Sequence, residues 1–237
     1  MNFNLKKCVF INFSLKRHCD ILHDYFLADV LLKQVYLIKD LGVYFTPKLS
    51  FSVHICKTVN KAFRMLGFVK RTLKPFGNVG VYKILYNSFI RSSLDYCSSV
   101  WSPHSKIFIS KVERVQKKFV KHLCYLTNNN FCNGNYATLC ELFQLTTLER
   151  RREICDLILF HKISHSKVNC SELLSSVCLN VPSRRTRHTE VLTTRKKCRI
   201  VLRKSDFIPR CAAKANTLDQ VDFFDSLLTK NMLNRVL

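Results

Sequence analysis

The sequence is poor in glycine and proline and has no long apolar run. It contains 5 Gly and 5 Pro in 237 residues, which argues against collagenous, linker-like and turn-dense all-β architectures. No apolar stretch approaches the ~20 residues of a membrane-spanning helix, and the start of the chain lacks the apolar core of a secretory signal. Hydrophobic residues still make up 47%. We therefore expect a mostly ordered intracellular protein, nuclear or cytoplasmic, with no membrane partner.

The signatures of common active sites are also missing. The sequence has no Walker loop, no Gly-x-Ser-x-Gly elbow and no His-Glu-x-x-His helix. A nucleic-acid polymerase needs acidic residues that converge on Mg²⁺, and no two aspartates are adjacent here. We assign no catalytic residue and expect no cofactor and no small-molecule substrate. A thiol nucleophile is disfavoured but stays open, because twelve Cys and eight His make chance contacts common.

The twelve cysteines contain no Cys-x-x-Cys pair, which argues against the usual structural zinc sites. One group comes near metal-ligand spacing: His161, His165, Cys170 and Cys178. Its neighbours Ile158 and Ile163 have the spacing of a helix core. We favour reduced, partly buried thiols and surface imidazoles over a zinc knuckle, and we expect no metal site.

Positive charge is what the chain has in excess, because 39 Lys+Arg face only 16 Asp+Glu, for a net charge of +23. Residues 57–125 hold fourteen Lys/Arg and two acids, and residues 182–214 hold eleven and two. Two such blocks predict two surfaces for a polyanion. We expect nucleic acid as the leading partner. An acidic protein or an anionic membrane surface is the alternative.

Hydrophobic periodicity predicts an α+β protein that is mostly α. Residues 1–50 are β-rich, with strands expected over 7–14, 25–27, 31–38 and 41–45 and a turn at Ala28-Asp29, where Asn-Gly is the usual hairpin pair. From residue 54 the period becomes helical. Helices are predicted over 54–73, 79–95 and 106–126, and a loop over 127–136 marks a boundary.

The C-terminal part is predicted to be less regular. Thr146 and Glu149 have the spacing of a capping box that would start a helix ending near Ile163. Residues 181–214 are basic and lack periodicity, so we expect irregular structure there. A short closing helix would place Val221, Phe224 and Leu228 on its apolar side.

Two of the predicted helices are amphipathic and cationic. The helix over 54–73 has a stripe of apolar residues, and its cations lie opposite within about 80° of arc around Phe68. The helix over 106–126 has the same division into an apolar and a cationic side. The helix over 79–95 carries Val81, Ile84, Leu85, Ser88 and Phe89 on its predicted inward side. The predicted nucleic-acid-binding residues are Lys57, Lys61, Arg64, Phe68, Arg71, Lys111, Arg114, Lys117, Lys118 and Lys121.

The order of several segments resembles the C-terminal part of reverse transcriptases of non-LTR, LINE-type (jockey-like) retrotransposons. The matching segments are NLKKC (4–8), KDLGV (39–43), HICKTVNKAFRMLGFVKR (54–71), LYNSFIRSSLDYCSSVWSP (85–103), KVERVQKKFVKHL (111–123), LTTLERRREICDLILFHKI (145–163) and VPSRRTR (181–187). The resemblance implies a palm remnant over 1–50, a helical thumb over 51–126, a C-terminal helical region over 127–180 and a basic tail with a terminal helix over 181–237.

The same resemblance implies roles for three further residues. Lys7 would be the motif lysine near the incoming nucleotide, and Leu41 and Gly42 would form the primer-grip turn. The aspartates that hold Mg²⁺ in that family have no counterpart in this sequence. We therefore expect a truncated fragment of an RNA-directed DNA polymerase that binds template–primer nucleic acid without sequence specificity and does not catalyse by itself. A non-catalytic basic interaction protein and a non-functional element relic are the alternatives.

Overall fold

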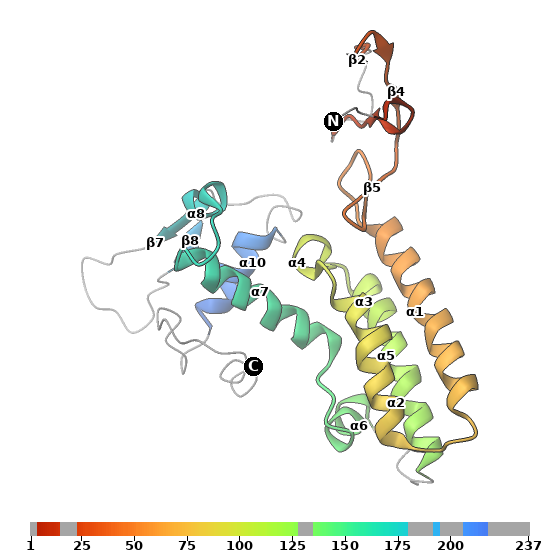
Figure 1. Cartoon of the computed structure of the whole chain (residues 1–237). Helices are drawn as coiled ribbons and strands as arrows, with labels where there is room; N and C mark the ends of the chain where they lie inside the picture. The colour runs from red at the N-terminus through yellow and green to blue at the C-terminus, as the bar shows by residue number, and fades with distance from the viewer. Residues whose placement is uncertain (1–3, 15–22, 128–134, 180–191, 195–205, 218–237) are drawn as a thin grey trace, which may run out of the picture.

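The structure is a computed structural model that describes residues 4–14, 23–127, 135–179, 192–194 and 206–217 (Figure 1). It is α+β and mostly helical, as predicted. Within the described residues, none of the helices is both long enough and apolar enough to cross a membrane.

Short strands paired two by two make up the N-terminal part. After the 3₁₀ helix η1 (Leu5–Lys7), β1 (Val9–Phe10) pairs in parallel with β4 (Lys33–Gln34). The strand predicted over 7–14 is thus limited to two residues and begins after Lys7. β2 (Phe26–Leu27) pairs antiparallel with β3 (Val30–Leu31), and β5 (Ile38–Asp40) pairs antiparallel with β6 (Val43–Phe45). The single strand expected over 31–38 is instead divided among three short strands, β3, β4 and β5.

Both antiparallel hairpins close through two residues with left-handed backbone. The φ angles are 49° and 59° at Ala28 and Asp29, and 43° and 88° at Leu41 and Gly42. Positive φ at both central residues is the type I′ geometry that matches strand twist. The predicted turn at Ala28-Asp29 is confirmed. Periodicity places Gly42 inside a strand, but it is the second turn residue, because the partners Asp40 and Val43 close the ladder on either side. The family resemblance implies a turn at Leu41 and Gly42.

The two cationic helices form as predicted and lie side by side (Figure 1). α1 spans Ser52–Leu73 and α5 spans Lys106–Leu126. Each buries its apolar stripe in a shared core and leaves its charged side in solvent. The buried apolar residues are Ile55, Val59, Ala62, Leu66, Val69 and Leu73 on α1, and Val112, Val115, Phe119, Val120, Leu123 and Cys124 on α5.

The helix expected over 79–95 forms as three consecutive segments: α2 (Val79–Leu85), the π-helix η2 (Tyr86–Arg91) and α3 (Ser92–Asp95). Its predicted side is wrong for Ile84 and Phe89, which are 63% and 55% exposed, whereas Leu85 packs partly buried against the core. The fully buried residues are Tyr82, Tyr86, Ile90 and Leu94. Tyr86 can be buried because its hydroxyl donates to Gln116 Oε1 at 2.9 Å and its ring stacks on Phe119 at 4.0 Å. This polar anchor decides which side faces inward.

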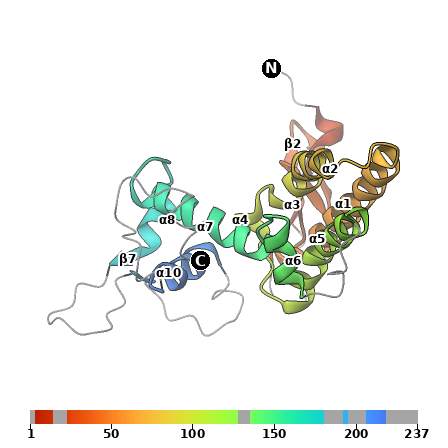
Figure 2. The same cartoon turned by 90° about the horizontal axis from the view of Figure 1, so that it is seen from below.

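The chain then turns toward a second, smaller core. After α4 (Ser98–Trp101) and α5 come α6 (Tyr136–Leu142), α7 (Leu148–Ser164), α8 (Ser171–Ser176), the β7–β8 pair (Val177–Leu179 and Leu192–Thr194) and α10 (Phe207–Ala215). α7 begins in the first core and ends in the second, where α10 packs on it (Figures 1 and 2).

Two C-terminal predictions need correction. The N-cap of α7 is Thr147, whose hydroxyl accepts from the Arg150 amide at 3.3 Å, and not Thr146. Part of the stretch expected to be irregular forms α10, because Ile208 and three small residues of this helix pack against α7. Most of the predicted 127–136 loop and the closing helix with Val221, Phe224 and Leu228 lie outside the described residues.

A buried polar cluster joins α5 to the segments that follow it. Glu113 accepts from the Tyr136 hydroxyl through Oε2 and from the Glu149 amide through Oε1, both at 2.6 Å. Gln116 Nε2 donates to the Thr146 carbonyl at 3.0 Å. Burial raises the pKa of the Tyr136 phenol, which keeps it a proton donor. One carboxylate therefore supplies the acceptor for the first turn of α7 and holds α6 beside it.

Replacing Glu113 by Ala should lower the free energy of unfolding by about 2 kcal/mol, because it removes a buried acceptor from two partly buried donors, the Tyr136 hydroxyl and the Glu149 amide. Urea unfolding followed by circular dichroism measures the change. Glu141→Ala, at an exposed position on α6, is the matched control and should change stability by less than about 0.5 kcal/mol. Equal effects of the two substitutions would contradict the role given to Glu113.

Candidate nucleic-acid interface

The exposed side of α1 is a row of cations around one aromatic ring. Lys57, Lys61, Arg64 and Arg71 are all exposed, and Phe68 is 57% exposed in their midst. The structure places these five residues on the side opposite the buried stripe, as the helical period requires. A flat apolar ring among solvated cations has no core to fill, so it is free to contact another molecule.

α5 contributes a second row of exposed cations, and part of it adjoins α1. Lys118 Nζ lies 4.9 Å from the Phe63 ring centroid, and Lys111 Nζ lies 3.9 Å from Cys56 Sγ. Lys117 turns the other way, with Nζ 5.0 Å from the Tyr136 ring centroid near α6. We call the cations of the two adjacent rows, with Phe68, the basic surface: Lys57, Lys61, Arg64, Phe68, Arg71, Lys111, Arg114, Lys118 and Lys121.

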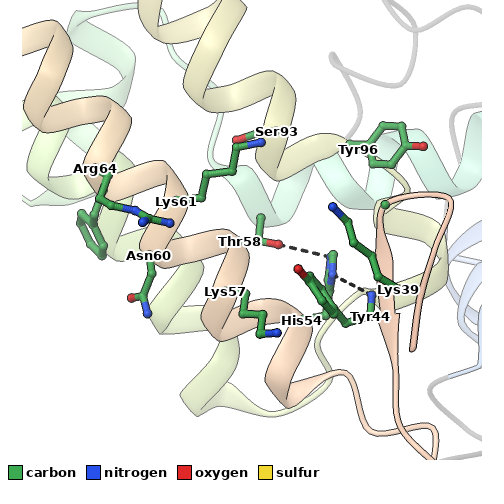
Figure 3. A pocket seen from close by; sticks show the side chains of 12 residues that line it. Lys39, Tyr44, His54, Lys57, Thr58, Asn60, Lys61, Arg64, Ser93 and Tyr96 are labelled. Atoms are coloured by element: carbon green, nitrogen blue, oxygen red, sulfur yellow. Dashed lines mark hydrogen bonds between the residues drawn. The ribbon is translucent and has the colours of Figure 1, made fainter. Parts of the chain in front are cut away.

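Beside this surface, a groove of about 980 Å³ lies between α1, α3 and the β5–β6 hairpin (Figure 3). Its cations come from two elements: Lys57, Lys61 and Arg64 from α1, and Lys39 from β5. Among the described residues that line it, none is a carboxylate. The remaining lining residues are Gly42, Tyr44, His54, Thr58, Asn60, Phe63, Ser93 and Tyr96. An open groove with four cations and no acid attracts an anion.

Tyr44 organises the two lysines at the hairpin end of the groove. Lys57 Nζ lies 4.0 Å from the Tyr44 ring centroid and Lys39 Nζ lies 5.7 Å from it, as Figure 3 shows. Cation–π contact of this kind restrains a long side chain without neutralising its charge. The sequence reasoning missed Lys39 and Tyr44. A two-residue turn at Leu41-Gly42 would have revealed them, because it makes Lys39 and Tyr44 cross-strand partners.

Two hydrogen bonds fix the hairpin against the helices. The Tyr96 hydroxyl donates to the Leu41 carbonyl at 2.9 Å. The Tyr44 amide donates to His54 Nδ1 at 3.3 Å, while His54 Nε2 lies 3.4 Å from Thr58 Oγ1. The His54 ring also packs 5.2 Å from the Trp101 ring. Since Nδ1 accepts a hydrogen bond, the imidazole is neutral with its proton on Nε2.

Not every residue predicted from sequence reaches the groove. Gly42 lines it, and Leu41 sits at the exposed tip of the same turn, 82% exposed. Lys7, in η1, is exposed and is not among the lining residues. Phe68 and Arg71 lie farther along α1, beyond the lining residue Arg64. The structure therefore joins one end of the basic surface to the hairpin and leaves Lys7 apart.

Within the residues that the structure describes, the residues weighed as zinc ligands do not form a metal site. The His161 and His165 rings lie 4.0 Å apart on one helix. The side chain of Cys178 lies outside the described residues. Across those described residues, no three His, Cys, Asp or Glu side chains gather in a way that could hold a metal ion. The donor set for the Mg²⁺ of the resembled family is likewise absent from them, so no step is assigned to that ion.

Comparison with known proteins finds little. No protein-family model matches the chain, and no solved structure is significantly similar to it. An uncharacterized protein of Caenorhabditis elegans is 30% identical over 97 residues, which is 40% of this chain and 48% of that protein. The chain thus matches about half the length of this relative, whose name states no activity.

The turn at Leu41-Gly42 allows a paired stability test. Gly42→Ala should destabilise the protein by about 1 kcal/mol, since φ is +88° and the new Cβ would lie 3.2 Å from the Tyr96 ring. Leu41→Gly should stabilise it by up to about 1 kcal/mol by relieving a left-handed leucine. Thermal unfolding of both variants measures the direction of each change in stability. Destabilisation by Leu41→Gly would contradict the type I′ turn.

Acid should weaken the docking of the hairpin. Burial lowers the pKa of His54 below its ordinary value of 6.5, so the unfolded chain binds the proton first. The contribution of His54 is complete above about pH 6.5 and is lost as pH falls toward the folded pKa. In urea unfolding between pH 8 and 5, His54→Gln should lose less stability on acidification than the unaltered protein. Parallel pH profiles would show that His54 is not the titrating group.

Proposed function

We propose that this chain binds RNA or an RNA–DNA duplex through the basic surface and the groove beside it, with little sequence preference. The observation that carries the proposal is the groove between α1 and the β5–β6 hairpin, where four cations from two elements line one cavity without a carboxylate among the described lining residues. Exposed cations that no carboxylate neutralises attract the phosphates of a polyanion.

The residue types favour contact with the nucleic-acid backbone. Lysine and arginine side chains that reach phosphates position a duplex but carry no sequence information. Phe68 adds an exposed flat ring that can lie against sugars or bases. The helical pair presents its cations over the length of α1, and a wide A-form minor groove is read through such shape and backbone contacts. The function proposed is therefore binding without base readout.

The sequence resemblance supports the same assignment from another direction. A thumb-like element of a LINE-type reverse transcriptase would hold template–primer duplex, and α1 and α5 carry two of the matching segments, 54–71 and 111–123. On this proposal the chain is the duplex-holding part of such a polymerase and does not copy nucleic acid by itself. A primer-extension assay on the purified chain should give no product. The site of action would be the cytoplasm or the nucleus.

Removing the positive charges that α1 contributes to the groove tests the proposal. The triple substitution of Lys57, Lys61 and Arg64 by Gln should weaken binding to a short RNA–DNA duplex at least tenfold at low salt. In the unaltered protein, about five phosphate contacts predict that log K falls with log salt at a slope of −4 to −5, and each lost contact reduces the slope by about 1. Fluorescence anisotropy measures both quantities.

The matched control replaces three exposed lysines outside the surface, Lys48, Lys106 and Lys162, by Gln. It removes the same charge and should leave the salt slope almost unchanged. Equal losses in the two triple variants would mean that net charge, and not the groove, governs binding. Duplex binding that is absent or independent of salt would overturn the proposal in favour of an acidic protein or anionic membrane partner.

A further inference from the structure

Lysines from α1 and α5 meet a histidine where these helices pack against α2. Lys70 Nζ donates to the Lys118 carbonyl at 3.3 Å, which ties the last turns of α1 to the middle of α5. The Tyr82 hydroxyl donates to the Lys70 carbonyl at 3.5 Å. The His122 ring, one turn beyond Lys118, packs edge-on against the Tyr82 ring at 5.2 Å. We call Lys70, Lys118 and His122 the seam cluster.

The seam cluster is a concentration of like charge. Burial and the charge of Lys118 lower the pKa of Lys70, and burial and the charge of Lys70 lower the pKa of His122. Within the described residues, the ion pairs involve α7 residues with Asp95 or α10, and none includes Lys70 or Lys118. The two lysines are therefore held close by helix packing and by the hydrogen bond from Lys70 Nζ to the Lys118 carbonyl, at an electrostatic cost that an anion would offset.

His122 also has unused hydrogen-bonding capacity. Its Nε2 atom is covered by protein atoms and has no hydrogen-bond partner. Buried polar groups in folded proteins are nearly always paired, so an orphaned ring nitrogen points to a missing partner. The ring packs against Tyr82 of α2, and Lys70 of α1 is the cation whose charge acts on it. Lys118, one turn earlier on α5, has its Nζ over the Phe63 ring. Because the neighbouring charge is positive, a proton on His122 is disfavoured until negative charge arrives.

We propose that the seam cluster is a phosphate site, in which Lys70 and Lys118 hold one phosphate group and His122 takes up a proton as it binds. This deepens the proposed function and rests on it, because the phosphate belongs to the bound nucleic acid. Neither Lys70 nor His122 is part of the basic surface, although Lys118 is. The site would extend the interface from the groove at the hairpin end of α1 to the seam near its other end.

A definite pH dependence follows from the proton. In the free protein, His122 stays neutral below its ordinary pKa of 6.5. A phosphate beside Lys70 cancels the charge that opposes protonation, so the pKa of His122 rises in the complex. Between the two pKa values, binding takes up a proton, and affinity for duplex must increase as pH falls through that range.

The test is duplex binding by the full chain between pH 8 and 5.5, combined with NMR titration of the histidine ring signals. We expect affinity to rise at least threefold on acidification and the His122 resonance to titrate at higher pH in the presence of duplex. In His122→Gln the rise should be lost, so that the affinities at pH 8 and at pH 5.5 become nearly equal. His104→Gln, at an exposed histidine, should keep the rise. Lys70→Gln should reduce the salt slope by about 1, and Lys162→Gln should not.

A second arm separates the possible sources of the phosphate. An upward shift of the His122 titration with inorganic phosphate, relative to chloride at equal ionic strength, supports a site that binds the group alone; a shift with duplex only supports a site that needs the strand. No shift with either overturns the proposal. Duplex binding that responds to Lys57, Lys61 and Arg64 but not to pH or to Lys70→Gln overturns the seam site and leaves the proposed function standing. If the variants unfold, the titration of the unaltered protein still decides.

Discussion

The packing of α1 against α5 determines where every cation of the basic surface lies. Each helix buries one apolar stripe in the shared core, and the 3.6-residue period then directs the charged positions of both helices into solvent. Contacts such as Lys118 over Phe63 close the gap between the two rows. Thus a hydrophobic interaction, and no attraction between charged groups, brings the cations together. A bound polyanion would reduce the repulsion between these cations.

The few acidic residues explain why the basic surface remains unneutralised. Glu113 is occupied by the start of α7 and the Tyr136 hydroxyl. Asp95 pairs with Arg151 at 2.7 Å, and Asp156 pairs with Arg210 at 2.9 Å. These carboxylates all act where α7 joins its neighbours. Among the described residues, these three carboxylates therefore join α7 to its neighbours and are not available to the cations of α1 and α5.

The sequence predicts the helices correctly where one helical period of apolar residues is clear. It fails where a buried hydrogen bond decides which side of a helix faces the core, or where a turn decides the pairing of two strands. The limits of α5 and the buried side of α1 follow from apolar spacing alone. The segment over 79–95 offers two apolar sides, and the hydrogen bond from Tyr86 to Gln116, thirty residues away, selects the less obvious one. A long-range partner such as Gln116 leaves no local signal near Tyr86. Lys39 was missed for a different reason: apolar alternation placed Gly42 inside a strand, and only the turn at Leu41-Gly42 pairs Lys39 with Tyr44.

The most direct test of the account is lysine acetylation footprinting of the folded chain with and without an RNA–DNA duplex. If one continuous surface binds the backbone, Lys39, Lys57, Lys61, Lys111 and Lys118 should be protected together, although they come from β5, α1 and α5. Lys162 on α7 should react equally in both states. Protection confined to the α7–α10 side, or no protection at a duplex concentration that saturates binding, would contradict the account.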